Sequence, residues 1–583
     1  MIHYRISAPQ PNNHLFEIDC FLDELNGEEA IVHLPSWRPG RYEMGNFARN
    51  IRSWKAFNEQ DERLVFRKIA NGQWQVQLNG ASKIRIHYSY YAFQLDAGAC
   101  WLDDEQWYIN PVHCMLFLPD RIHEACRVRL DIPVHYKVAT SLQRESEQDW
   151  LADDFHELAD SPMIASANMQ HASYLISGKT FHIWFQGKCQ PEWNKIIGHF
   201  KSFSEEQIRM MGDFPVSVYH FLVQVLPTAF YHGVEHQKST VLAIGPGSSL
   251  MDPKEYTDFV GVASHELFHT WNVKKIRPAD LLPYNYTREN YSRLGYVYEG
   301  VTTYYGDLIL ERCGVYSPEQ FFSEINQRLQ RHFHNYGRFN LSVAESSFDT
   351  WLDGYGTAIP HRRTSIYDEG CLIALMTDLL IRIRTGGKFS LDDVMRDLYN
   401  DFGKKNIGYT EHDYFTLVEN RIGEAATDFF SDFIYGTDDY EPVLRQLLSS
   451  AGCELEVKPN PAIYERWFGF KISAVDSKAV VTLVAPGSVA EKAGLSRGDE
   501  LIAVNKMQVV DNFEELIRTN GRNRVSVMLS SLNGKIKELF LTPSNEEYYA
   551  SYTIRKKENA SAEERRLYSQ WLMRDFVMEA VRT

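Results

Sequence analysis

The chain has 583 residues, roughly four times a ~150-residue domain, so we expect three or four domains. Hydrophobic residues make up 44% and charged residues 24%, which excludes a disordered chain and a collagen-like fibre. Acidic residues outnumber basic ones 77 to 61, for a formal net charge of −16. No Lys/Arg-rich block offsets this charge, so nucleic acid and anionic membranes are excluded as expected partners.

The eight cysteines are scattered, without a CxxC pair. This usage predicts buried thiols in a reducing compartment. The N-terminus lacks a basic region followed by an apolar run, and no stretch approaches ~18 apolar residues. We therefore expect a cytoplasmic protein without a signal peptide or a membrane span.

Residues 1–175 are predicted to form an all-β, sandwich-like domain. Runs of alternating apolar and polar residues, rich in β-branched and aromatic side chains, indicate strands. They lie at 14–22, 29–35, 74–78 and 83–93. Asn79-Gly80 stands between the last two runs, as in a β-hairpin turn.

Residues 176–457 are predicted to form an α+β domain, mostly helical after residue 250. Strand-like runs at 217–226 and 239–245 come first. Ser317, with Pro318 at the first helical position, and Thr410, with Asp413, are helix start signals. Glycines end the helical runs 296–312 and 366–384.

The last two segments differ from each other. Residues 458–545 return to short strands and glycine turns, with one helix near 512–519. Residues 546–583 form a tail whose run 561–581 predicts a terminal helix, capped by Ser561 and Glu564. The fold class predicted is therefore multidomain α+β.

The strongest motif is an HExxH sequence, His265-Glu266-Leu267-Phe268-His269. Residues four apart share one helix face, so both imidazoles can bind one Zn²⁺ while Glu266 projects toward a bound water. The mostly apolar segment 259–263 before the motif favours a buried helix, and Pro278 is expected to stop that helix. The alternative is a pair of surface histidines without a metal.

A catalytic zinc site needs a third protein ligand. Glu299 lies in an otherwise uncharged, aromatic stretch, 296–305, where a buried carboxylate is costly unless paired or metal-bound. Glu299 is therefore the candidate, with a buried ion pair as the alternative. Glu289 and Asp280 are rivals in loop-like sequence.

A second motif, His232-Gly233-Val234-Glu235-His236, matches the inverted zinc pattern HxxEH. Gly233 and the following β-branched run predict a strand instead. Four residues of a strand span ~13 Å, too far for two histidines to share one zinc. We therefore do not expect a metal here.

Four segments resemble the glycyl aminopeptidase family, family 61 of the metallopeptidases. They are SHELFHTWNVKKIRP (264–278), YVYEG followed by Val301 and Thr302 (296–302), LPSWRPGRY (34–42) and SIYDEGCLIALMTDLLIR (365–382). The resemblance spans nearly the whole chain and implies a thermolysin-like, gluzincin catalytic domain.

The resemblance implies one zinc per chain, with His265, His269 and Glu299 as ligands. It also implies Glu266 as the general base toward the zinc-bound water, which can pass the proton to the leaving amine. Related aminopeptidases hold the substrate amine with the glutamate of a Gly-x-Met-Glu-Asn strand. Gly233 and Glu235 match that strand, although the Met is missing and His236 replaces the Asn.

Two further roles follow. Gluzincin aminopeptidases use a tyrosine of a later helix as oxyanion donor, and Tyr367 is the matching candidate. Residues 480–505, with Gly469-Phe470 before them, resemble a PDZ domain. Gly469 and Phe470 match its carboxylate-binding loop, which holds a peptide C-terminus. The alternative is a groove filled by this chain's own tail.

The sequence therefore predicts a zinc metallopeptidase. The resemblance alone suggests an aminopeptidase that removes Gly or Ala from peptides. The rivals are an endopeptidase assisted by the PDZ domain and a non-catalytic peptide-binding scaffold.

Overall fold

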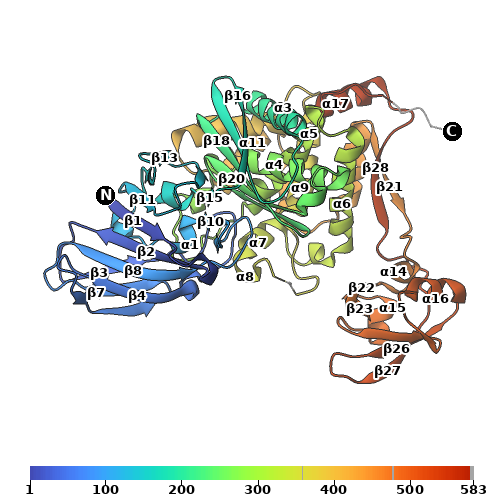
Figure 1. Ribbon diagram of the computed structural model, residues 1–583. Coiled ribbons are helices and arrows are strands. Elements are labelled where there is room, and N and C mark those ends of the chain that lie inside the picture. The colour runs from blue at the N-terminus through green and yellow to red at the C-terminus, as the bar shows by residue number, and fades with distance from the viewer. Residues whose placement is uncertain (357–358, 476–477, 578–583) are drawn as a thin grey trace. The chain divides into compact units, whose positions relative to one another are not determined.

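The computed structural model describes residues 1–356, 359–475 and 478–577 and shows two compact units (Figure 1). Unit 1 consists of Met1–Ser317, Ser347–Gly356 and Leu391–Asn420. Unit 2 consists of Pro318–Ser346, Thr357–Ser390 and Arg421–Thr583. The four predicted domain boundaries stay predictions.

The N-terminal part of unit 1 is β-rich, as predicted. Its largest sheet has eight strands, and β1 and β11 pair in parallel while the others are antiparallel. Along β2 the buried residues alternate with less buried ones, because successive side chains of a strand point to opposite faces. The order is β13 (Gln143–Arg144), β14 (Asp149–Ala152), β11 (Cys126–Leu130), β1 (Ile2–Ser7), β2 (Leu15–Leu22), β8 (Ile84–Tyr91), β4 (Ile51–Phe57) and β5 (Arg63–Leu64).

Two smaller sheets accompany it. One has the order β3 (Glu29–His33), β7 (Gln73–Gln77) and β6 (Phe66–Ala70), and the other β12 (Lys137–Thr140), β15 (Met163–Ser166), β10 (Gln106–Ile109) and β9 (Trp101–Leu102). The short helices α1 (Pro111–Cys114) and α2 (Phe155–Ala159) lie between their strands in sequence.

The hairpin predicted at Asn79-Gly80 is wrong. Both residues have positive φ, 49° and 86°, and Ala81 N–H bonds the Leu78 carbonyl, so a tight turn is present. However, β7 belongs to the three-stranded sheet and β8 to the eight-stranded one. The turn therefore passes the chain between sheets, because β8 pairs with β2 and β4 rather than with its neighbour in sequence.

A mixed five-stranded sheet follows in unit 1. Its order is β16 (Met169–Ile176), β17 (Lys179–Gln186), β18 (Val218–Val225), β20 (Ser239–Gly245) and β19 (Phe230–Glu235). The predicted strands 217–226 and 239–245 are confirmed as β18 and β20. β19 pairs only with β20 and lies at one edge of the sheet.

The helices of unit 1 that position the site are α4 and the pair η6 and α5. α4 ends at Phe268, nine residues before the position where Pro278 was expected to stop it, so that expectation is wrong. Beyond Phe268 the chain turns: the N–H groups of Trp271 and Asn272 both bond the Phe268 carbonyl, and both side chains are buried. The bounds are α3 (Trp193–Met211), α4 (Pro253–Phe268), η6 (Tyr296–Val301), α5 (Thr302–Arg312), α8 (Thr350–Asp353) and α10 (Leu391–Asp401).

Unit 2 contains helices followed by a two-stranded sheet, β21 (Cys453–Lys458) with β28 (Ser551–Lys556). The predicted helix starts are confirmed at Pro318 and, for α11, beside Thr410 and Asp413, which exchange side-chain to backbone hydrogen bonds. The helices are α6 (Pro318–His334), α9 (Asp368–Arg384), α12 (Ala425–Phe429) and α13 (Tyr440–Ser450); α7 (Val343–Phe348) and α11 (Glu411–Ile422) span the passages between units.

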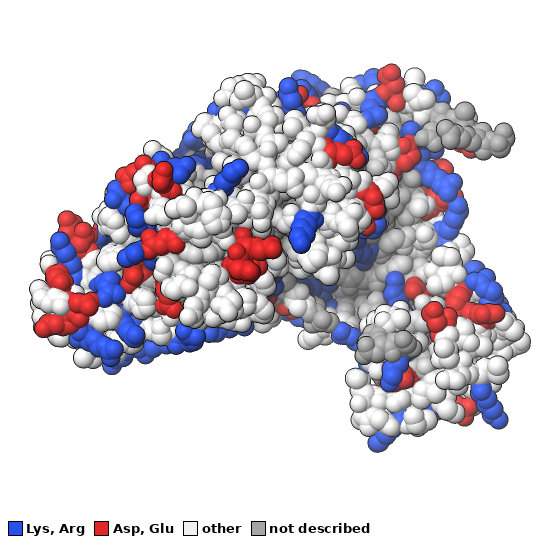
Figure 2. All heavy atoms as spheres, in the orientation of Figure 1, with Lys and Arg blue, Asp and Glu red and all other residues white. Residues whose placement is uncertain are grey.

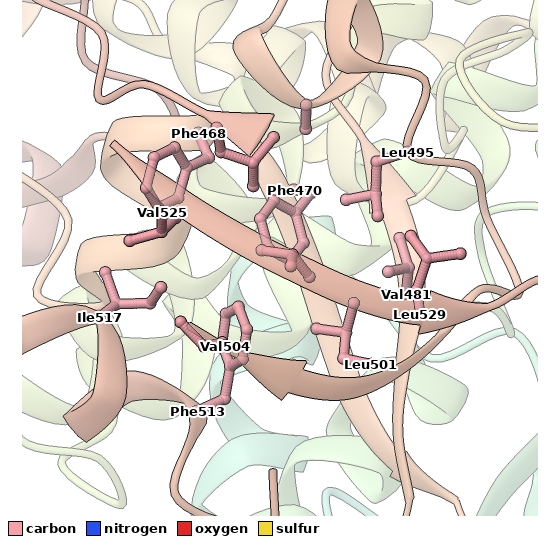
Figure 3. Close-up of a cluster of buried hydrophobic side chains, with 13 residues drawn as sticks. Phe468, Phe470, Val481, Leu495, Leu501, Val504, Phe513, Ile517, Val525 and Leu529 are labelled. Atoms are coloured by element: carbon pink, nitrogen blue, oxygen red, sulfur yellow. The ribbon is translucent and has the colours of Figure 1, made fainter. Parts of the chain in front are cut away.

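A PDZ fold, as predicted, lies within unit 2. Its sheet has the order β22, β23, β24, β26, β27, with β25 paired to β24. Figure 3 shows Phe470 and other buried side chains of the strands gathered with Phe513 and Ile517 of α16. The bounds are α14 (Ile463–Phe468), β22 (Phe470–Val475), β23 (Lys478–Val484), α15 (Val489–Ala493), β24 (Glu500–Val504), β25 (Met507–Gln508), α16 (Phe513–Asn520), β26 (Val525–Ser530) and β27 (Ile536–Leu541).

The terminal helix α17, Ala562–Leu572, begins at the predicted Ser561–Glu564 capping box but is shorter than predicted. Met573 takes a left-handed conformation, φ 53°, and Phe576 folds back against Tyr568 at 5.0 Å. The predicted helical residues 578–581 lie outside the described residues.

The surface and the thiols agree with the sequence analysis. Lys and Arg are interspersed with Asp and Glu on the face shown in Figure 2. The eight cysteines, all described, are free thiols, and six of them are buried. No helix among the described residues has the length and apolar character to cross a membrane.

Candidate metal centre and its surroundings

The HExxH motif occupies the C-terminal end of α4. His265 and His269 project from the same face, because 3.6 residues make one helical turn, and their Nε2 atoms lie 3.0 Å apart. His269 is buried and caps the helix, while His265 keeps 19% of its side chain exposed. The motif therefore presents two ring nitrogens to one point in space.

Glu299 reaches the same point from η6. Its Oε2 atom lies 3.4 Å from His269 Nε2 and 3.9 Å from His265 Nε2. Gly306 permits this approach: a Cβ atom there would lie 3.2 Å from the His265 Cα atom. Asn272 joins the two elements, since its side-chain amide donates to the Val297 carbonyl at 3.0 Å.

These three residues fit a zinc ion. Tetrahedral ligands at ~2.0–2.2 Å from zinc lie about 3.3 Å from one another, and the three observed separations of 3.0, 3.4 and 3.9 Å bracket that value. Two neutral imidazoles and one carboxylate are also a ligand set of catalytic zinc sites that leaves a fourth position open.

Hydrogen bonds from neighbouring residues orient two of these candidate ligands. His269 Nδ1 donates to the Asn272 carbonyl at 2.6 Å, which leaves Nε2 with a free lone pair. The Tyr42 hydroxyl donates to Glu299 Oε1 at 2.9 Å and leaves Oε2 facing the histidines. Tyr42 belongs to the segment 34–42, whose resemblance to the family was noted without a role for Tyr42.

Glu266 is buried beside the three candidate ligands, and its Oε2 atom has no hydrogen-bond partner in the described structure. Burial, together with the charges of Glu235 and Glu299, raises the pKa of Glu266 to about 8. Gly233 packs directly on this carboxylate: a Cβ atom there would lie 2.2 Å from Oε1. A carboxyl with a pKa near neutrality can both take up and release a proton.

Glu235 ends the edge strand β19 but does not face solvent. It is 3% exposed, and its Oε1 atom has no hydrogen-bond partner among the described residues. Burial alone would raise the pKa of Glu235, but Lys274 and His269 outweigh it and lower the pKa. Glu235 is therefore a buried anion with a free oxygen.

The Lys274 ammonium is bound elsewhere. It lies 3.0 Å from Asp160 Oδ1, and His236 Nδ1 lies 3.1 Å from the same oxygen. No contact of Glu235 with Lys274 as an ion pair is present among the described residues. Lys274 stabilises the negative charge of Glu235 through space while leaving its oxygen available.

A loop of the β-rich part covers this end of the site. Gly40, with φ 81°, packs on Glu235: a Cβ atom there would lie 2.3 Å from Oε2. Arg38 of the same loop is 4% exposed and lowers the pKa of Glu266 against the effect of burial. Neither residue was predicted from the sequence, although the Pro39-Gly40 pair within the segment 34–42 is a signal that could have indicated a loop there.

Three other residues singled out from the sequence are not among the candidate metal ligands. Tyr367 immediately precedes α9 in unit 2, is partly buried, and its role stays a prediction. His232, on β19, receives a hydrogen bond from Ala97 N–H at 3.3 Å, whereas His236 faces Asp160. The strand conformation that argued against an HxxEH helix is confirmed.

In the PDZ fold, Gly469 has φ 76° and Phe470 begins the edge strand β22. Tyr464 of α14 contacts both Phe470, at 5.5 Å, and Phe513 of α16, at 5.3 Å. The Ile463 N–H also bonds Glu514 at 3.1 Å. Helix α14, which precedes Gly469, therefore contacts both β22 and α16, and Tyr548 of the segment after the PDZ fold packs against Gly469.

Three segments of the chain match known protein families. Residues 3–167 match the peptidase M61 N-terminal domain, residues 258–373 match the M61 glycyl aminopeptidase family, and residues 480–527 match a PDZ domain. The chain is a metallopeptidase, and two of its segments match models of the M61 family. The predicted resemblance and fold class are thus confirmed. None of the curated proteins matches the sequence.

Solved structures similar to this chain include an aminopeptidase N family protein from Idiomarina loihiensis. It is 26% identical, with a TM-score of 0.90 over 98% of this chain and 100% of that one. A variant M1 zinc metallopeptidase from Deinococcus radiodurans, bound to a Tyr-Ser-Ala substrate, is 13% identical. Its TM-score is 0.46 over 75% of this chain and 94% of that one.

Proposed function

We propose that this metallopeptidase is a zinc-dependent aminopeptidase that removes small N-terminal residues, Gly or Ala, from peptides. His265, His269 and Glu299 would hold one zinc ion per chain. The observation that carries the proposal is the set of three donor-atom separations, which bracket the edge length of a zinc tetrahedron. The buried anion at Glu235 supports the exopeptidase assignment.

Zinc supplies Lewis-acid polarisation of the scissile carbonyl when it is bound. Glu266 takes a proton from the attacking water and returns it to the leaving amine; its burial beside the candidate ligands, with Oε2 free of a hydrogen-bond partner among the described residues, supports this role. Tyr367 is the proposed oxyanion donor. Gly233 lets β19 pass close to Glu266, because a Cβ atom there would collide with the Glu266 carboxylate.

Glu235 binds the substrate ammonium group. Its unpaired Oε1 atom is an acceptor that a protonated amine can satisfy, and a buried carboxylate gains more from such a pair than an exposed one. Gly40 closes the space behind it. A chain that continued past the amine would meet this loop, so free N-termini are favoured over internal peptide bonds.

The PDZ fold would bind a peptide C-terminus beside Gly469 and Phe470. The Gly469 N–H, which bonds the Glu465 carbonyl at 3.0 Å, would have to change partner to hold the carboxylate. Peptides are the proposed partners, and a cytoplasmic location remains the proposal from composition. Tyr464 and α14 would have to yield part of their contacts with Phe513 for a peptide strand to add to β22.

The experiment compares Gly-p-nitroanilide, Ala-p-nitroanilide and their N-acetylated forms, with the zinc-loaded wild type and Glu235→Gln. We expect hydrolysis of the free amines only, and a loss of about 10²-fold in kcat/KM for Glu235→Gln, because a charge-assisted hydrogen bond is lost. Equal cleavage of acetylated substrates would instead identify an endopeptidase. Peptide binding without turnover would identify a scaffold.

A further inference from the structure

A second buried cation lies next to the proposed general base. Arg38 is 4% exposed, and among the described residues its guanidinium makes one hydrogen bond, from Nη1 to the Pro39 carbonyl at 3.3 Å, and no ion pair. A guanidinium has five N–H donors. Leaving most of them unsatisfied in a buried position is costly unless a ligand or water accepts them.

Arg38 is one of the residues that line a cavity of about 250 Å³. We call it the arginine pocket. All of its lining belongs to unit 1. Gly98 packs flat on the guanidinium, since a Cβ atom there would lie 2.3 Å from Cζ. The residues that define it here are Arg38, Arg41, Arg49, Asp96, Gly98 and His113.

The acidic side chains that line the arginine pocket already accept hydrogen bonds or form an ion pair with another residue. Asp96 accepts from Gly98 N–H at 2.7 Å and from Gln94 at 2.6 Å. Glu43, also in the lining, pairs with Arg41 at 2.5 Å and accepts from Tyr355 N–H. Arg38 is thus the buried charge of this pocket that is left without a direct counter-ion among the described residues.

The arginine pocket is next to the reacting end of the site. Ala97 N–H bonds His232, the residue before Gly233, and Gly233 packs on Glu266. The charge of Arg38 also acts on Glu266. A peptide with its amine at Glu235 and its first peptide bond at Glu266 extends ~3.3 Å per residue beyond that bond, so its next residues can reach this pocket.

We propose that Arg38 in the arginine pocket binds a carboxylate on the leaving-group side of the scissile bond, which makes short peptides with a free C-terminus the preferred substrates. The inference rests on the proposed aminopeptidase function. The planar fork of arginine suits a carboxylate, which accepts two parallel N–H···O bonds. An acidic side chain just after the scissile bond offers the same chemistry, and the test separates the two sources.

The test measures kcat/KM of the zinc-loaded enzyme for Ala-Ala-Ala, Ala-Ala-Ala-amide, Ala-Asp-Ala-amide and Ala-p-nitroanilide. We expect the wild type to prefer the free acid over the amide by about 10-fold or more, as for a hydrogen bond between charged groups. The preference should fall in Arg38→Gln toward 1, and Arg38→Lys should keep part of it. Arg5→Gln, at an exposed pair with Asp131, controls for net charge and should keep all of it.

Each outcome decides a separate point. Rescue of the amide by the internal Asp identifies a side chain as a source of the carboxylate, and no rescue identifies the C-terminus. Equal wild-type rates for the acid and both amides would overturn the inference, even if Arg38→Gln failed to fold. Absence of Ala-p-nitroanilide turnover by the wild type would overturn the proposed function itself.

Discussion

Two clusters of buried charge adjoin each other in unit 1, and their charges are satisfied to different degrees. In the aspartate cluster, Asp160 accepts from Lys274, His236 and the Gln237 N–H at 3.0, 3.1 and 2.8 Å. In the glutamate cluster, formed by Glu235, Glu266, Glu299, His265 and His269, two buried carboxylate oxygens have no partner among the described residues. Consecutive residues, Glu235 and His236, belong to the two clusters.

The difference indicates a structural role for the aspartate cluster and a ligand-binding role for the glutamate cluster. A buried carboxylate with both oxygens hydrogen-bonded stabilises its surroundings, whereas unpaired buried carboxylates oppose folding unless a cation binds. The aspartate cluster can therefore hold the end of β19 in place. The glutamate cluster keeps free acceptors that a metal ion and a substrate amine can fill.

The largest effect is expected from breaking the aspartate cluster. Asp160→Asn leaves Lys274, whose side chain is 1% exposed, without its counter-ion, and should lower the free energy of unfolding by about 3–5 kcal/mol. The matched control is Asp401→Asn, which removes an exposed pair with Lys405 and should cost less than about 1 kcal/mol. Urea unfolding measures both. Equal losses would show that the two pairs do not differ.

Removing a ligand of the glutamate cluster should instead reduce zinc affinity. A four-ligand zinc site binds with about 10–16 kcal/mol, so one ligand accounts for about 3 kcal/mol, roughly 10²-fold. Glu299→Gln should show that loss in a competition titration with a zinc chelator. Glu289→Gln is the control from the rival loop and should bind zinc as the wild type does. A reversal of the two results would assign the ligand to Glu289.

The aspartate cluster should also make stability depend on pH. Burial would raise the pKa of Asp160, but Lys274 and His236 outweigh it and lower the pKa in the folded protein. A carboxyl with a lowered folded-state pKa contributes stability above its unfolded-state pKa of ~3.9 and loses it as the pH falls toward the folded value. The stability gap between wild type and Asp160→Asn should be constant from pH 5 to 8 and narrow below about pH 4. A gap that widens in acid would contradict the cause.

A smaller effect is expected from the outer shell. Tyr42→Phe removes the hydrogen bond to Glu299 Oε1 and should weaken zinc binding by about 10–100-fold. Turnover at saturating zinc should fall less than zinc affinity does. Tyr91→Phe changes an exposed tyrosine and should alter neither quantity. Unchanged zinc affinity in Tyr42→Phe would show that the loop that carries Tyr42 does not support zinc binding.

Much of the fold could be predicted from local patterns. Alternation predicted β2 and β8, and the capping box predicted the start of α17 at Ser561. Pairing between distant segments could not: the Asn79-Gly80 turn is real, but the strands beside it join different sheets. The helix α4 ends at Phe268, well before Pro278, so the proline does not set its end.

The residues of the site also differ in whether they could be predicted from the sequence. His265, Glu266 and His269 are recognisable because one helix carries all three, and Glu299 because its stretch is otherwise uncharged. Tyr42 and Arg38 come from a loop more than 200 residues earlier, so no spacing rule links them to the helix. Their contribution depends on how the β-rich part packs within unit 1.

The most direct test of the central claim is zinc content and Gly-p-nitroanilide turnover measured together for the wild type and Glu266→Gln. We predict about one zinc per chain in both proteins, with turnover about 10²–10⁴-fold lower in the variant, because only the general base is removed. The metal-free variant should unfold at no lower temperature than the wild type, since the unpaired oxygen at this position is then uncharged. A wild type without zinc, or a zinc-loaded Glu266→Gln with wild-type turnover, would contradict the account.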